Sequence, residues 1–138
     1  MTDPDLIEKK LAQIETCLAE LRRLARLEEI SRDVREERFV EHTLQIAIQV
    51  ALNVASHIVS DERLGEPATN RQLFELLVRA GWLDEEVGPR LRDMAGFRNI
   101  LVHGYAEVDT RILRDIVEHR LGDLVAFVSA IRRRLPRA

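Results

Sequence analysis

Residues 44–59 read LQIAIQVALNVASHIV, and this stretch decides the fold class. Its apolar residues cover most of the circumference of an α-helix, which predicts a central helix from Phe39 to Ser60. The stretch is too short, and too often interrupted by polar residues, to cross a bilayer. Polar residues recur at every fourth position and form one stripe that we expect to face solvent, a partner or a cleft: Glu41, Gln45, Gln49, Asn53 and His57.

The composition indicates one folded domain spanning residues 1–138. Hydrophobic residues make up 46% of the chain and charged residues 33%, which is enough for a packed core. Only six glycines and four prolines are present, too few turn-forming residues for an all-β fold. The single cysteine, Cys17, excludes an internal disulfide, and no Cys/His pattern typical of zinc is present, so we expect no metal and no other cofactor.

The net charge and the N-terminal residues indicate which binding partners and which cellular location we expect. The net charge is −3, so the protein as a whole does not attract nucleic acid, and any contact with RNA must be local. The first ten residues, MTDPDLIEKK, contain no apolar signal-peptide core. We therefore expect a cytoplasmic protein that does not enter a membrane.

Four further helices are predicted around the central one. Apolar residues spaced by three and four predict a first helix over residues 5–29. The segment between the first two helices is mostly charged and is expected to be a solvated turn. Thr69 and Gln72 form a capping box that opens a short helix ending at Ala80, with Gly81 as its stop.

The last two helices complete an up-and-down bundle. Asp84 and the pair Gly88–Pro89 compete as the start of the fourth helix, which runs to about His103. Asp109 caps one long last helix, whose apolar residues continue to Leu135. Five helices without a strand candidate predict an all-α bundle.

Arg98 interrupts the apolar face of the fourth helix. At 100° per residue it falls inside the apolar arc, among positions such as Leu91 and Met94. Burying an unpaired guanidinium costs several kcal/mol, so the side chain must pair, reach an edge or border a cavity. The pattern leaves open a structural ion pair with a neighbouring helix and a functional role.

Two further polar residues lie near the end of the same helix. His103 follows Arg98 by five residues, at the end where the helix dipole favours a protonated imidazole. Asn99 precedes His103 by four residues and shares its edge. An intact helix would separate His103 from Arg98, but Gly104 ends the helix, so the last turn can unwind or a second subunit can complete the cluster.

Phe97 and Ile100 are apolar residues on the face opposite the predicted core arc. We expect them to lie in the interface of a twofold dimer, in which two fourth helices meet across a composite cleft. The alternative is that a neighbouring helix of the same chain covers them.

Residues 97–105 read FRNILVHGY and contain the R-N-x3-H-x-Y motif of HEPN domains. The chain resembles the HepT toxin family in particular. The resemblance extends from residues 47–62 through residues 81–87 and 94–105 to residues 108–113, where the last helix begins.

The resemblance implies an all-α HEPN fold and a homodimer in which the two motifs face each other. It also implies a toxin of a toxin–antitoxin pair with metal-independent endoribonuclease activity, in which Arg98 and His103 are the catalytic pair and Asn99 supports them. The implied partner is a minimal nucleotidyltransferase antitoxin that adds adenylate groups to Tyr105. The alternative function is a non-catalytic helical module that binds a nucleotidyltransferase partner or a nucleotide.

Overall fold

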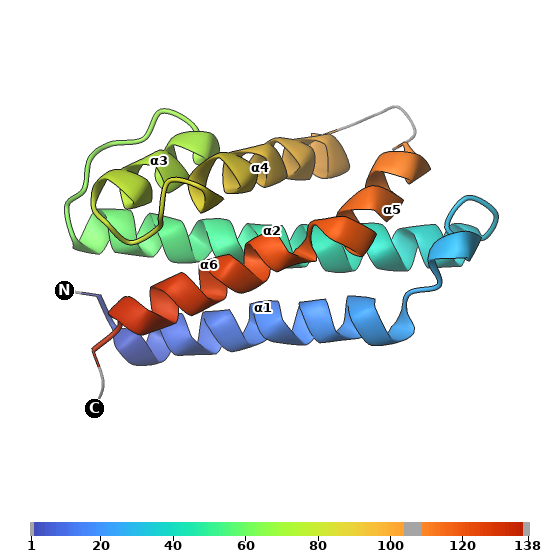
Figure 1. Ribbon diagram of the computed structural model, residues 1–138, viewed down its shortest axis with the longest axis horizontal. Helices are drawn as coiled ribbons and strands as arrows, with labels where there is room; N and C mark the ends of the chain where they lie inside the picture. The colour runs from blue at the N-terminus through green and yellow to red at the C-terminus, as the bar shows by residue number, and fades with distance from the viewer. Residues whose placement is uncertain (1, 104–108, 137–138) are drawn as a thin grey trace.

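The computed structural model describes residues 2–103 and 109–136 of the chain, and its regular elements there are all helical (Figure 1). The prediction of an all-α bundle is confirmed, although six α-helices take the place of the expected five in the described residues. They are α1 (Pro4–Leu24), α2 (Val34–Asp61), α3 (Asn70–Arg79), α4 (Val87–His103), α5 (Thr110–His119) and α6 (Leu121–Arg134), with a short 3-10 helix η1 (Leu27–Glu29) after α1.

α2 is the central helix, as its sequence predicts. It contacts each of the other five α-helices, with α1 on one side and α3 and α4 on the other (Figure 1). Among the described helices it alone has the length and hydropathy of a membrane span, but most of its apolar window is buried by the rest of the bundle. This is the position of a core helix, in which apolar residues on nearly every side meet a neighbour.

The first two helices differ from their predicted bounds. α1 ends at Leu24 and not at Glu29, because Ala25 adopts an extended backbone and η1 follows it. α2 begins at Val34, before the expected Phe39, and Asp33 caps it by accepting a hydrogen bond from the next helical turn. Charged residues without an apolar pattern continue the helix here, so hydrophobic periodicity alone missed its first turn.

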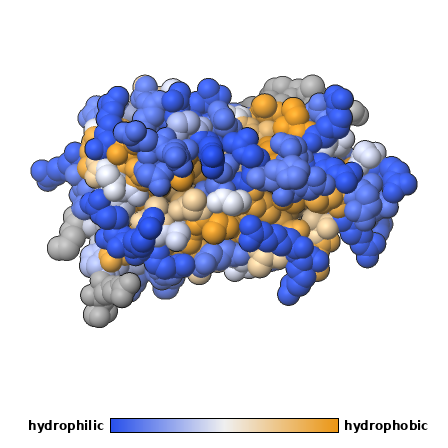
Figure 2. Space-filling view, in the orientation of Figure 1, coloured by the Kyte–Doolittle hydropathy of each residue, from blue (hydrophilic) through white to orange (hydrophobic). Residues whose placement is uncertain are grey.

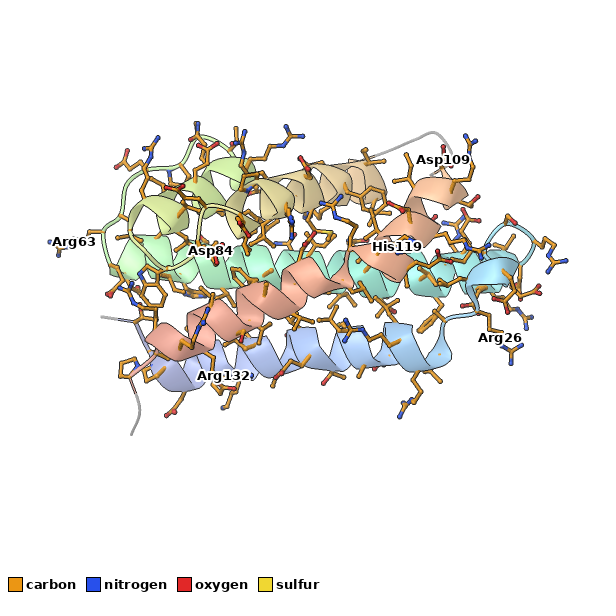
Figure 3. All side chains as sticks on the ribbon, viewed as in Figure 1. Arg26, Arg63, Asp84, Asp109, His119 and Arg132 are labelled. Carbon is orange, nitrogen blue, oxygen red and sulfur yellow. The ribbon has the colours of Figure 1, made fainter. Side chains whose placement is uncertain are left out.

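Side-chain hydrogen bonds to the backbone lie at the starts of α3 and α4. Thr69 Oγ1 accepts a hydrogen bond from the backbone N–H of Gln72 at 3.4 Å, as expected, while Gln72 Oε1 reaches back to the N–H of Ala68 at 2.6 Å. Asp84 Oδ1 accepts from the N–H of Val87 at 3.1 Å (Asp84 is labelled in Figure 3). α4 itself begins at Val87, between the two predicted starts, after a turn over residues 85–86.

The last predicted helix is broken at Arg120, so the prediction of one long helix is wrong. α5 and α6 meet there at a bend (Figure 1). Arg120 Nε donates to the buried carboxylate of Asp123 at 2.9 Å, and Arg90 of α4 approaches the same carboxylate at 3.9 Å. The apolar line runs through the break without interruption, which is why periodicity did not reveal it.

Candidate functional site

The C-terminal part of α4 and the N-terminal half of α2 form the surroundings of the predicted site. The two helices pack against each other and run in opposite directions (Figure 1). Leu101 of α4 lines an open pocket of about 500 Å³ together with residues of the first turns of α2. The end of α4 that carries the polar motif therefore faces a hollow and not a closed core.

Arg98 lies where the sequence predicts, on the buried side of α4. Leu91, Met94 and Ala95 on the same arc are buried, and Arg98 itself is half-buried. Its Nε is buried without a hydrogen-bond partner, and its Nη1 donates to Asn99 Oδ1 at 3.4 Å. Among the described side chains, no carboxylate lies within 4.0 Å of the guanidinium, so the expected alternative of a structural ion pair finds no partner in that part of the chain.

The remaining residues of the motif are placed only in part. The backbone of α4 ends at His103, as predicted, but the imidazole lies outside the described side chains. Gly104 and Tyr105 lie outside the described residues. The grouping of His103 and Tyr105 with Arg98 therefore stays a prediction.

Phe97 does not lie on an open face of the chain. It is 7% exposed and belongs to the core, whereas Ile100 is 53% exposed. The expectation that both residues lie outside the core is wrong for Phe97. α4 packs against α2, α3 and α6, so neighbouring helices cover more of its circumference than a single core arc suggests.

The residues of the polar stripe of α2 lie in two different surroundings, the pocket and the interior of the bundle. Glu41 and Gln45 line the pocket, so this part of the stripe faces a cleft. Further along, Gln49 Nε2 donates to Asn53 Oδ1 at 3.1 Å, and Gln49 Oε1 is buried without a partner among the described residues.

Four side chains of α2 that line the pocket were not among the predicted site residues: Arg38, Phe39, His42 and Thr43. The expectation that the stripe faces a cleft was the one signal that could have found them, since they flank Glu41 on the same helix. Burial raises the pKa of the Glu41 carboxyl, and the neighbouring Glu37 raises it further, while Arg38 acts in the opposite direction.

This arrangement suits recognition of an anion. A half-buried guanidinium without a carboxylate partner among the described side chains lies one helical turn from a pocket with hydrogen-bonding side chains. Arginine presents its N–H groups in a planar fork that matches phosphate oxygens. In the described residues, no three His, Cys, Asp or Glu side chains converge as a metal site would require.

A family model described as "Ribonuclease HepT-like" matches residues 13–131. The chain belongs to the HepT-like ribonuclease family. Its enzyme class is therefore that of a ribonuclease, and the R-N-x3-H-x-Y phrase is the part of the sequence that had pointed to this family.

Individual HepT-like proteins resemble most of the chain. The mRNA nuclease HepT of Shewanella oneidensis is 29% identical over 93% of this chain and 97% of its own length. The tRNA nuclease HepT of Aphanizomenon flos-aquae is 28% identical over 78% of this chain and 74% of its own length. A solved structure of the tri-AMPylated Shewanella oneidensis HEPN toxin in complex with MNT antitoxin has a TM-score of 0.86 and 28% identity, covering 96% of this chain and 99% of that one.

Proposed function

We propose that this HepT-like protein is the toxin of a toxin–antitoxin pair and a metal-independent endoribonuclease that acts in the cytoplasm. The observation that carries the proposal is the guanidinium of Arg98, half-buried on α4 and without a carboxylate partner among the described side chains. The relatives support it, since they are nucleases of mRNA and tRNA and one is bound to an antitoxin.

In the proposed reaction Arg98 stabilises the charge that develops on the phosphorane, and Asn99 orients Arg98 through the hydrogen bond to its Nη1. His103 takes the proton from the ribose 2′-OH or delivers one to the leaving 5′-oxygen. The 2′-oxygen bonds to phosphorus as the bond to the 5′-oxygen breaks. The products therefore carry a 2′,3′-cyclic phosphate and a 5′-hydroxyl.

A homodimer fits this chemistry better than a monomer. One positioned acid or base contributes about 10²–10⁴-fold to a rate, so a site that pools the arginine and histidine of two chains is more effective. Ile100 lies two residues from Arg98 and is exposed, which suits a contact between the two α4 helices.

Control by a nucleotidyltransferase antitoxin is supported by the tri-AMPylated relative in complex with MNT antitoxin. Tyr105, the proposed target, is two residues beyond His103 in the sequence. Adenylate groups added to its hydroxyl place bulk and negative charge where the RNA backbone enters, and this blocks the substrate by repulsion and occlusion.

The alternative is a module that binds a nucleotidyltransferase partner or a nucleotide without cleaving RNA. Arg98 suits this function as well, because an arginine can bind a phosphate without promoting its cleavage. The two functions differ in whether RNA is cut.

The experiment compares the wild type with Arg98→Ala, His103→Ala and Tyr105→Phe, each expressed with and without the adjacent gene, which we expect to encode the nucleotidyltransferase antitoxin. We expect the wild type alone to arrest growth and fragment RNA, and each alanine variant to lose activity by about 10²-fold or more. The purified wild type should cut RNA in excess EDTA. With the adjacent gene, mass spectrometry should detect added adenylate on the wild type and none on Tyr105→Phe.

Arg92→Ala is the matched control, because Arg92 lies on the same helix but pairs with Glu75 of α3 at 3.1 Å. It should keep the activity of the wild type. Intact RNA at high protein concentration, or equal cutting by His103→Ala, would contradict the catalytic proposal and favour the binding module.

A further inference from the structure

The pocket beside the end of α4 is not used by the proposed cleavage chemistry. It has a volume of about 500 Å³, within the range of roughly 300–1,000 Å³ that is usual for small-ligand sites. Its lining combines a carboxylate, an amide, a hydroxyl, an imidazole, a guanidinium and an aromatic ring: Arg38, Phe39, Glu41, His42, Thr43 and Gln45 of α2, closed by Leu101 of α4.

We propose that this pocket binds a nucleobase next to the scissile phosphate and that Glu41 and Gln45 select guanine. The proposal rests on the proposed ribonuclease function, since it assigns the specificity of the same site.

The pocket is in the right place for a base that flanks the cleaved bond. Leu101 follows Arg98 by three residues, so the pocket opens about 4.5 Å along α4 from the residue proposed to hold the phosphate. A base attached to the ribose at that phosphate is therefore close enough to enter the pocket while Arg98 holds the phosphate.

The lining suits a base from single-stranded RNA. Such bases are unstacked, rest on aromatic side chains and are recognised by hydrogen bonds to their Watson–Crick edges. Phe39 is half-buried and supplies the aromatic surface. Glu41 and Gln45 are half-buried as well and supply the hydrogen-bonding groups.

The spacing and chemistry of Glu41 and Gln45 match guanine. The two residues are four apart on α2 and so lie side by side on the helix. A carboxylate only accepts hydrogen bonds, and guanine offers it two adjacent donors, N1–H and the N2 amino group. The amide N–H of Gln45 can donate to guanine O6.

The other bases fit less well. Adenine and cytosine each offer one amino donor beside a ring nitrogen that only accepts, and uracil offers one N–H between two carbonyl oxygens. The carboxylate of Glu41 would face a repelling acceptor in each case. A bidentate contact with the right base discriminates by about tenfold or more.

The test uses short uridine-rich RNAs with one guanosine, inosine, adenosine or cytidine. Cleavage beside that residue is measured as kcat/KM for the wild type, Glu41→Gln and Glu62→Gln. Glu62 is the exposed C-cap residue of α2, at the other end of the helix from the pocket, so Glu62→Gln is the matched control. Urea unfolding of each variant verifies its fold.

We expect the wild type to prefer guanosine over adenosine by about tenfold or more, with inosine between them because it lacks the N2 amino group. Glu41→Gln should reduce the preference to below about threefold, since an amide replaces one acceptor with a donor. Glu62→Gln should keep it. Equal cleavage beside all bases would overturn the proposal, and so would an unchanged preference for guanosine in Glu41→Gln. The proposal would also fail if Glu41→Gln altered inhibition by the antitoxin and left the base preference as it is.

Binding of the same RNAs, followed by fluorescence anisotropy, separates this inference from the proposed function. If the wild type cuts no RNA, the ribonuclease proposal fails. The base pocket is still supported in that case if the wild type binds guanosine-containing RNA selectively and Glu41→Gln abolishes that selectivity. Binding without any preference for guanosine overturns the pocket.

Discussion

Arg98 Nε and Gln49 Oε1 are polar atoms buried without hydrogen-bond partners among the described residues. They lie on α4 and α2, two helices that pack against each other. A buried polar atom without a partner costs about 1–3 kcal/mol of stability. Proteins commonly tolerate such unfavourable polar atoms at functional sites, where function requires a group that lowers stability.

Gln49→Leu should therefore fold at least as stably as the wild type. The change removes the unpartnered oxygen, which costs about 1–3 kcal/mol, and also the hydrogen bond to Asn53, which contributes about 1 kcal/mol. We therefore expect the free energy of unfolding in urea to stay the same or to rise by up to about 1 kcal/mol. Asn53→Leu is the comparison, because it removes the acceptor of Gln49 Nε2 and should lower that free energy by about 1 kcal/mol. A clear loss of stability in Gln49→Leu would mean that its oxygen has a partner.

At the scale of elements, one arginine joins the first helix to the last. Arg132 of α6 contacts Glu8 of α1 at 2.6 Å and Glu15 of α1 at 2.7 Å (Figure 3). The hydrogen bond from Arg132 lowers the pKa of the Glu15 carboxyl, with partial burial acting against it and the arginine charge adding to it. α1 and α6 are far apart in the chain, so this contact ties the first helix to the last.

This contact should make stability depend on pH. Because the pKa of Glu15 is lower in the folded state, its contribution is fully present above its unfolded pKa of 4.5 and is lost as the pH falls through the lower folded pKa. Glu15→Gln should thus lose less stability than the wild type between pH 7 and pH 3 in urea unfolding. The side chains are about half exposed, so we expect a difference of at most about 1 kcal/mol.

Glu20→Gln is the matched control for this effect, since Glu20 lies on α1 outside the contact with Arg132. It should follow the pH dependence of the wild type. Identical acid sensitivity of Glu15→Gln and the wild type would show that the ion pair adds nothing to stability.

At the scale of the whole molecule, hydrophobic side chains gather on the surface over the C-terminal end of α4 (Figure 2). Ile100 is 53% exposed there, and Ile112 of α5 is 49% exposed. Exposed apolar patches next to a candidate site are typical of interaction surfaces. This face is the one that we propose to join two copies of the chain.

Ile100→Glu should weaken the proposed dimer. A charge placed in an apolar interface must be desolvated, so light scattering should record a lower mass than for the wild type at the same concentration, and RNA cleavage should fall by about tenfold or more. Val125→Glu changes another exposed apolar residue, on α6, and should alter neither measurement. A monomeric wild type that still cuts RNA would contradict the composite site.

The sequence by itself determined the helical class, the starts of α3 and α5, and the family. Caps such as Thr69 and Asp109 act within one turn of the chain, so their effect can be read locally. The position of Arg98 within the apolar arc of α4 also follows from helix geometry alone. The R-N-x3-H-x-Y phrase identified the family because its residues lie within nine positions of each other.

Only the tertiary structure decided which helix faces are covered and where the last helix bends. Phe97 is buried because three other helices surround α4, and α6 separates from α5 where Arg120 meets the buried Asp123. The tertiary structure also places Leu101 beside the first turns of α2, and together they form the pocket at Glu41, where the polar stripe begins. These outcomes depend on contacts between residues far apart in the chain, and periodicity along one helix carries no information about its neighbours.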